Sequence, residues 1–140
     1  MTNEETKKLK VAVVGSSNFN ESNKEALYEV LDKNADKIEM IISGGSNIGA
    51  DSIGRLYAKD RGLPCLILYP NYYPSNGQYD KGASFKRNIE MIKESDVIVA
   101  VWDGVSRGTG HFLEMAKKSN KKIKIIHFEG KNNVDEVKSA

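Results

Sequence analysis

Three glycine-rich loops carry the residue types in this chain that could bind a charged small molecule. They span residues 15–18, 43–51 and 103–110. Glycine lets the backbone approach a ligand closely and adopt positive φ angles. The second and third loops run directly into helical patterns, and the first backbone amides of a helix favour an anionic group. Together the three loops predict a phosphate cradle.

Alternating strands and helices are predicted to position these loops. Apolar runs and amphipathic patterns predict strands at 9–15, 38–43, 65–69, 96–102 and 122–128, with helices starting near Ser22 and Ser84 and spanning 49–60 and 110–119. This alternation implies an α/β fold: a Rossmann-like, doubly wound parallel sheet of about five strands with helices on both faces. Ligands of such sheets lie outside the carboxyl ends of the strands, where the three loops converge.

Helix signals and the end of the chain lead to further expectations. Ser22 and Glu25 form the S-x-x-E pattern of a capping box. Ser84 is expected to cap the third helix, whose buried side would be Phe85, Ile89 and Ile92. Lysines 122 and 124 lie on one side of the last strand, which predicts a sheet edge, and the polar tail 129–140 is expected to form at most one loose helical turn.

Length and composition limit the organisation of the chain. Its 140 residues predict one domain over 9–128 between a polar leader, 1–8, and the tail. The net charge is only +2 and the lysines are spread out, so there is no strong nucleic-acid signal. No apolar stretch suggests a signal peptide or membrane span, which predicts the cytoplasm. The lone Cys65 excludes an internal disulfide and a cysteine-cluster metal site, and no metal or cofactor is expected.

Two common nucleotide-binding motifs are absent. The chain has no G-x-x-x-x-G-K-[ST] pattern, which excludes a P-loop NTPase. The first loop has one glycine where a dinucleotide site has G-x-G-x-x-G, and the second strand ends in Ser43 where that site has a ribose-binding acid. A dinucleotide-dependent redox enzyme is therefore not predicted.

The loop motifs, taken together, resemble those of the SLOG superfamily, which contains the Smf/DprA and LOG proteins. They are Ser43-Gly44-Gly45 with Gly49-Ala50-Asp51, Gly82 with Lys86-Arg87-Asn88, and Ser106-Arg107-Gly108-Thr109. The likeness covers about residues 9–128 and is greatest to the small YspA-like members. It implies a Rossmann-like domain, often dimeric, that binds nucleotides or nucleotide-derived ligands.

The LOG enzymes are phosphoribohydrolases with an R-x-x-x-M segment and a G-G-x-G-T-x-x-E loop. Arg87 and Met91 match the first, and the resemblance implies that Arg87 contacts phosphate or ribose. Gly108 and Thr109 match the second, but Phe112 stands where the LOG pattern has its glutamate. The resemblance therefore favours binding over catalysis and leaves Asp103 and Glu114 as the candidate catalytic acids.

These observations predict a module that senses or sequesters a phosphorylated nucleotide-derived molecule, such as a nucleotide, cyclic nucleotide or ADP-ribose-type signal. The alternative is a nucleoside 5′-monophosphate N-glycosidase of the LOG type. A protein or DNA adaptor of the DprA kind is less favoured because the charge is not concentrated. The expected partners are the small molecule and other copies of the chain, not a membrane.

Four tyrosines of the long loop either stack on a base or anchor their loop: Tyr69, Tyr72, Tyr73 and Tyr79. The predicted ligand-binding residues are Gly15, Ser16, Gly44, Gly45, Asp51, Arg87, Asn88, Ser106, Gly108 and Thr109.

Overall fold

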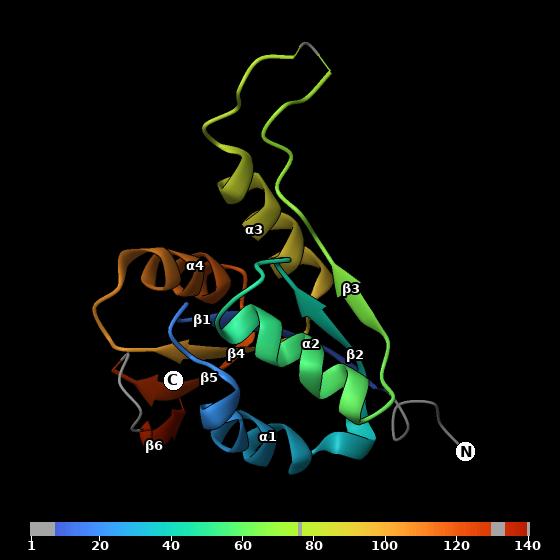
Figure 1. Cartoon of the computed structure of the whole chain (residues 1–140), viewed down its shortest axis with the longest axis vertical. Coiled ribbons are helices and arrows are strands. Elements are labelled where there is room, and N and C mark those ends of the chain that lie inside the picture. Colours follow the sequence, from blue (N-terminus) through green and yellow to red (C-terminus); the bar gives the residue numbers. More distant parts are fainter. Residues whose placement is uncertain (1–7, 76, 130–133, 140) are drawn as a thin grey trace.

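A twisted sheet forms the centre of the molecule (Figure 1), a computed structural model that describes residues 8–75, 77–129 and 134–139. Its strands are β1 (Leu9–Gly15), β2 (Ile38–Ser43), β3 (Cys65–Ile67), β4 (Val97–Trp102), β5 (Lys122–Phe128) and β6 (Val134–Ser139). They lie in the order β3-β2-β1-β4-β5-β6. The pairs from β3 to β5 are parallel, and β6 is antiparallel to β5. The predicted α/β Rossmann-like fold is confirmed, with one strand more than expected.

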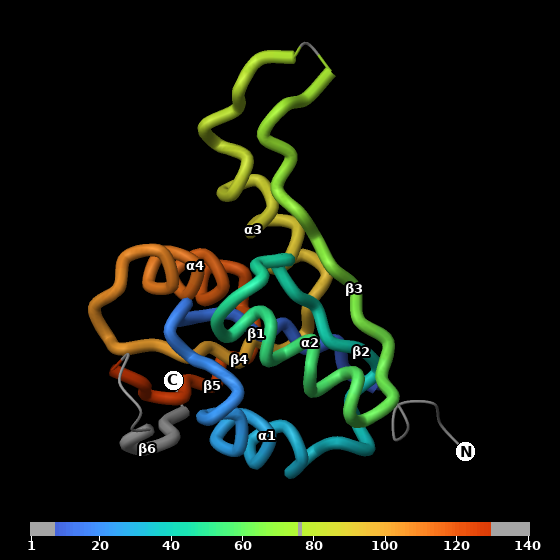
Figure 2. Tube along the Cα trace, viewed as in Figure 1, coloured from blue at the N-terminus to red at the C-terminus, as the bar shows by residue number. Residues whose placement is uncertain are grey.

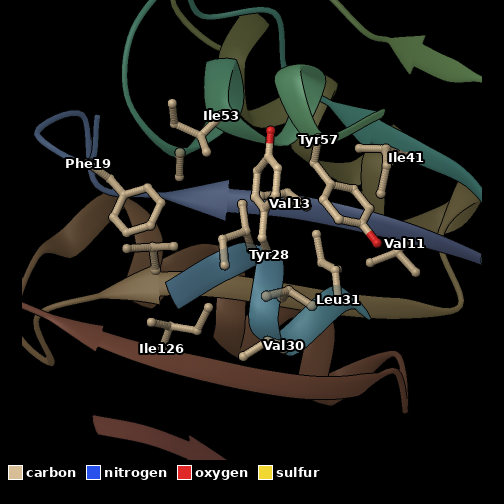
Figure 3. Close-up of a cluster of buried hydrophobic side chains, with 14 of the residues drawn as sticks. Val11, Val13, Phe19, Tyr28, Val30, Leu31, Ile41, Ile53, Tyr57 and Ile126 are labelled. Atoms are coloured by element: carbon tan, nitrogen blue, oxygen red, sulfur yellow. The ribbon is translucent and has the colours of Figure 1, made fainter. Parts of the chain in front are cut away.

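Helices cover both faces of this sheet, and Figure 1 shows α3 and α4 on one side and α1 on the other. The helices are α1 (Lys24–Asp32), α2 (Ala50–Asp60), α3 (Ala83–Glu94) and α4 (Arg107–Lys118), with short 3₁₀ turns η2 (Glu21–Asn23) and η3 (Ala35–Lys37). One apolar cluster joins α1 and α2 to the sheet, with Tyr28, Val30, Ile53 and Tyr57 around Val13 (Figure 3). A second cluster joins α3 and α4 to the opposite face. Burial on both faces explains why β1 and β4 are apolar at nearly every position.

The order of the strands reverses beside β1. The chain passes from β1 through β2 to β3 on one side and then returns to β4 on the other side of β1. The loops after β1 and β4 therefore diverge at the carboxyl ends of these strands, the place where this class of fold binds its ligands.

The end of the chain differs from the sequence-based expectation. β5 is not a sheet edge, because β6 pairs with it from Lys124 opposite Ser139 to Phe128 opposite Val134. The part of the tail that the structure describes is therefore a strand where a loose helical turn was expected. The pairing of β6 depends on contact with a distant segment, which a local hydrophobic pattern does not reveal. The predicted leader lies outside the described residues except for Lys8.

Two helix starts also differ. The first capping box is formed by Asn20 and Asn23 at the start of η2, not by Ser22 and Glu25. Ser84 does not cap α3, since Gly82 is the N-cap residue and the Ser84 hydroxyl lies 2.7 Å from the hydroxyl of Tyr72.

The buried face of α3 is another correction. Phe85 and Ile89 are 45% and 38% exposed, and the buried residues are Ala83, Met91 and Ile92. Both sets of residues have helical spacing, so the pattern alone does not decide which face meets the sheet.

A long segment between β3 and α3 extends away from the sheet (Figure 2). We call residues 68–82, apart from residue 76, the tyrosine loop. β3 ends at Ile67, two residues before the predicted end, although the amide of Leu68 still donates to the Ser43 carbonyl at 2.8 Å. Among the described residues, no helix is long and apolar enough to cross a membrane.

Candidate functional site

The loop after β2 brings together three of the predicted site residues. Arg87 extends from α3, and its Nη1 donates a hydrogen bond to the carbonyl oxygen of Gly44. A Cβ atom on Gly44 would lie 2.8 Å from that Nη1 and 3.0 Å from Oδ2 of Asp51, so glycine is needed there for space. Nε of Arg87 donates to Oδ1 of Asn88 at 2.9 Å. The guanidinium is therefore already engaged by protein groups.

Asp51, in the first turn of α2, is held inside this loop. Its Oδ2 accepts a hydrogen bond from the amide of Ser46 at 3.3 Å. Burial is the main influence on its carboxyl and raises the pKa, while the Ser46 amide and the charges of Arg87 and Arg55 oppose that shift. The carboxylate faces inward toward the loop and so serves as an internal anion.

Arg55 belongs to this site and was not predicted. Its Nη1 donates to Oγ of Ser43 at 3.1 Å, and its Nη2 donates to the carbonyl of Ser46 at 2.7 Å. The signal that could have identified it is its position four residues after Asp51 on one helix, a spacing at which opposite charges face each other.

Gly15 and Ser16 close the loop after β1 against its neighbours. Gly15 has a φ of +138°, and a Cβ atom there would lie 2.1 Å from the carbonyl oxygen of Val101 on β4. The Ser16 amide donates to that same oxygen, and the Ser16 carbonyl accepts from the amide of Ala50, both at 2.9 Å. The first amide of α2 is thus bonded to the protein itself.

The loop after β4 is organised by Asp103. Its Oδ1 accepts from the amides of Val105 and Ser106 at 2.9 and 2.7 Å, and its Oδ2 accepts from Oγ of Ser106 at 2.6 Å. The hydroxyl and the amides of this loop lower the Asp103 pKa to about 2. Asp103 therefore serves as a loop anchor, and Ser106, Gly108 and Thr109 lie at the start of α4 just beyond it. The amides predicted to bind phosphate at the start of α4 are therefore bonded to a carboxylate of the chain itself, that of Asp103.

Glu114, the other candidate catalytic acid, does not lie in the loop after β4. Phe112 is buried in the core beneath α4, whereas Glu114 is exposed. The ring of His111, one turn after Arg107, lies 5.5 Å from that of Phe85, which places the starts of α3 and α4 side by side.

The tyrosine loop carries exposed aromatic rings. Tyr69, Tyr73 and Tyr79 are 68%, 66% and 57% exposed. Tyr79 stacks on Tyr72 with a centroid distance of 5.6 Å and an interplanar angle of 3°, and it meets Tyr73 edge-on at 5.7 Å. The ring of Tyr69 covers Gly45, where an added Cβ atom would lie 2.5 Å from that ring. Tyr72 anchors the loop, and the other three rings present faces or edges to solvent.

Comparison with known proteins found similarity in structure. No protein-family model and no curated protein sequence matches the chain. DNA processing protein A (DprA) from Streptococcus pneumoniae superposes with a TM-score of 0.67 at 18% identity, over 86% of this chain and 51% of that one. DprA from Helicobacter pylori, whose structure describes a unique single-stranded DNA binding mode, superposes with a TM-score of 0.64 at 23% identity, over 98% and 72%. The chain thus spans about half the length of the first of these proteins.

These likenesses correct the functional predictions. A nucleotide-derived small molecule was predicted as ligand and partner, and no nucleic-acid signal was found in the sequence. Both predictions are contradicted by the structural neighbours, which process and bind DNA. The alternative, an N-glycosidase of the LOG type, finds no support in them either. A low and evenly spread net charge argues against a duplex-binding stripe, but single strands also bind by stacking on aromatic rings, beside a local group of basic side chains. The structural neighbours of the chain are DprA proteins of the SLOG superfamily, and it shares their Rossmann-like α/β fold.

Proposed function

We propose that the chain binds single-stranded DNA through the tyrosine loop and the adjoining starts of α3 and α4. The observation that carries this proposal is the set of exposed rings of Tyr69, Tyr73 and Tyr79 on a fold similar to that of the H. pylori DNA-binding protein. Every base presents a flat face, so aromatic side chains bind single strands with little sequence preference. Exposed rings held in place by neighbouring rings lose little freedom when a base stacks on them.

Basic side chains close to this loop supply contacts for the phosphates. Lys81 and Arg107 are exposed at the starts of α3 and α4, and the contact between Phe85 and His111 brings these helix starts together. Lys86 is exposed as well, although it forms an ion pair with Asp80 at 2.7 Å.

Of the residues predicted from the loops, Gly108 and Thr109 are the best placed to contact DNA phosphates, because the amide and the hydroxyl of Ser106 already donate to Asp103. Both lie in the first turn of α4, next to Arg107. Arg87, Asn88, Asp51 and Gly44 are instead used to hold the loop after β2 in place. Gly15 and Ser16 likewise join β1 to β4 and α2.

Binding of a fluorescently labelled oligo(dT) of about 20 nucleotides, followed by anisotropy at about 50 mM NaCl, tests this function. Tyr69→Ala, Tyr73→Ala and Tyr79→Ala should each weaken binding, because one stacked base contributes about 1–3 kcal/mol. The Phe variants at the same positions keep the ring and should bind like the native chain. Absence of binding, or equal affinity in the Ala and Phe variants, would contradict the proposal.

Finer assignments stay predictions. They are the placement of the chain beside the YspA-like or LOG-like SLOG proteins, a homo-oligomeric state, a cytoplasmic location, and the domain limits 9–128.

A further inference from the structure

A cluster of lysines surrounds a cavity at the amino ends of the strands. The cavity has a volume of about 680 Å³. Leu9, Ile38, Val97 and Lys122, the first residues of four parallel strands, line it. Because these strands run in one direction, the cavity lies at the opposite end of the strands from the loops after β1, β2 and β4. We call it the lysine cavity.

Five lysines line this cavity, and no acidic residue does. Asn34 and Asn120 add side-chain amides to the lining. The apolar residues Val11, Val30 and Leu31 are buried and pack in the core where α1 meets the sheet (Figure 3), so they offer little surface to an occupant. The lysines come from η3, α4, β5 and the turn before β5, and they are Lys37, Lys117, Lys121, Lys122 and Lys124.

These lysines have no counter-ion in the described part of the chain, where none of the five forms an ion pair. The negative end of the α4 dipole accounts for Lys117, but Lys37, Lys122 and Lys124 come from other elements. The whole chain has 21 basic and 19 acidic side chains, so five lysines without an acid among them depart from its overall balance. An anionic surface outside this copy of the chain accounts for the cluster.

A row of glutamates on η2 and α1 has the opposite charge. Glu21, Glu25 and Glu29 are four residues apart, a spacing that places side chains on one face of a helix. All three are exposed, and α1 lies at the outside of the molecule (Figure 1). Among the described residues, none of the three forms an ion pair, whereas the next acid, Asp32, pairs with Arg61 at 2.8 Å. We call these three glutamates the acidic row.

We propose that the acidic row of one copy of the chain docks on the lysine cavity of a second copy. Helix α1 joins the two surfaces, because Glu25 and Glu29 belong to the row and Leu31 lines the cavity. Glu25 and Leu31 are six residues apart, which is about 9 Å along a helix. Two copies related by a twofold axis, with their α1 helices antiparallel, therefore place each acidic row opposite the cavity of the partner.

The chemistry of this interface predicts weak, reversible association. Surface ion pairs are individually weak and are screened by salt, and the large apolar side chains of α1 are buried in its own core. A net charge of only +2 gives little repulsion between copies. The proposal does not rest on DNA binding, because the tyrosine loop lies at the other end of the strands.

Sedimentation velocity of the full-length chain tests the association. At about 50 mM NaCl the average sedimentation coefficient should rise between about 10 and 500 µM protein, and at about 500 mM NaCl this rise should be lost, because salt screens exposed charges. Association through apolar contacts would persist at the higher salt concentration. A monomer under both conditions, or a dimer that salt does not affect, would overturn the proposal.

Charge reversal on each surface tests whether the two surfaces meet. Glu25→Lys with Glu29→Lys should weaken association at least about tenfold, and Lys122→Glu with Lys124→Glu should do the same, since each change sets like charges opposite each other. An equimolar mixture of these two variants should associate like the native chain, because each reversed surface then meets its complement. Damage to the fold would not be rescued in this way, and the melting temperature of each variant checks folding.

A matched control and the location of the interface complete the test. Lys59→Glu with Lys93→Glu reverses the same number of charges at exposed positions outside the cavity and should associate like the native chain. In NMR spectra the amides of the acidic row and of the cavity lysines should shift with protein concentration. Failure of the mixture to associate, an equal loss in the control, or shifts confined to the tyrosine loop would contradict the interface. Shifts of the cavity amides caused by oligo(dT) in a monomeric sample would make DNA the occupant and would also overturn it.

Discussion

Arg87 and Gly44 are 43 residues apart in the chain, and the hydrogen bond from Nη1 of Arg87 to the Gly44 carbonyl joins α3 to the loop after β2. The arginine is half-buried, and the same loop encloses Asp51, whose pKa is influenced by the Arg87 charge. One side chain thus fixes the position of the helix from which Phe85 and Ile89 face solvent.

Loss of this link should lower the stability of the fold. Arg87→Ala should reduce the free energy of unfolding by about 1.5–3 kcal/mol, the range for hydrogen bonds that involve a charged group. Urea unfolding measures this change. Arg107→Ala, at an exposed position, is the control and should change stability by less than about 0.5 kcal/mol. Equal stability of the two variants would show that the link does not hold the loop.

The contact between Gly15 and Val101 predicts a larger effect. Gly15→Ala should lower the free energy of unfolding by more than about 3 kcal/mol, because the new Cβ meets backbone atoms of β4 and the positive φ adds strain. Gly104→Ala tests the strain alone, since Gly104 has a φ of +89° and no atom within 4 Å of an added Cβ. Its cost should be about 1 kcal/mol. Thermal unfolding compares the pair, and similar losses would refute the close packing of β1 against β4.

Asp103 predicts a pH dependence of stability. Its folded pKa of about 2 lies below the unfolded value of about 3.9. The stabilisation is therefore complete above the unfolded pKa and is lost as pH falls through the folded pKa. Unfolding of the native chain and of Asp103→Asn between about pH 5 and 2 should show a stability difference that shrinks toward low pH. The lowered pKa values of Asp32 and Asp80 are common to both proteins and cancel. A difference that stays constant would contradict the role of Asp103.

Salt dependence tests the phosphate contact assigned to Arg107. For single strands the logarithm of the binding constant falls with the logarithm of salt concentration by about 0.7 for each phosphate contacted. Arg107→Gln should therefore make the slope shallower by about 0.7 in anisotropy titrations between about 50 and 200 mM NaCl. Lys59→Gln, on the far end of α2, should leave the slope unchanged. An unchanged slope in Arg107→Gln would place the DNA elsewhere.

Most of the strands could be predicted because each apolar run is bounded by clear signals. β1, β2 and β5 begin and end at the predicted residues. β6 could not, because only Val134 and Val137 are apolar and its pairing depends on β5. The exposed face of α3 was also missed, since Phe85 and Met91 each lie on an apolar stripe of this helix and only the tertiary packing selects one of them.

The candidate site could be located from the sequence but not interpreted. Glycines at three loops correctly predicted where strands β1, β2 and β4 end. Whether the following helix starts are open to an anion depends on the directions of Asp51 and Asp103, and both carboxylates turn toward loop amides. Arg55 was missed because its partners, Ser43 and the Ser46 carbonyl, become neighbours only when α2 packs on the sheet.

β3 has a consequence for the behaviour of the protein at high concentration. It is the edge strand beside β2 and contains only three residues, Cys65–Ile67. Pro64 precedes it and Pro70 follows shortly after, and proline has no amide hydrogen to donate to an incoming strand. Long, flat edge strands are templates for aggregation, and natural proteins shorten them or flank them with proline. An intermolecular strand could therefore add only a few hydrogen bonds at this edge, which should protect the chain from amyloid-like growth there.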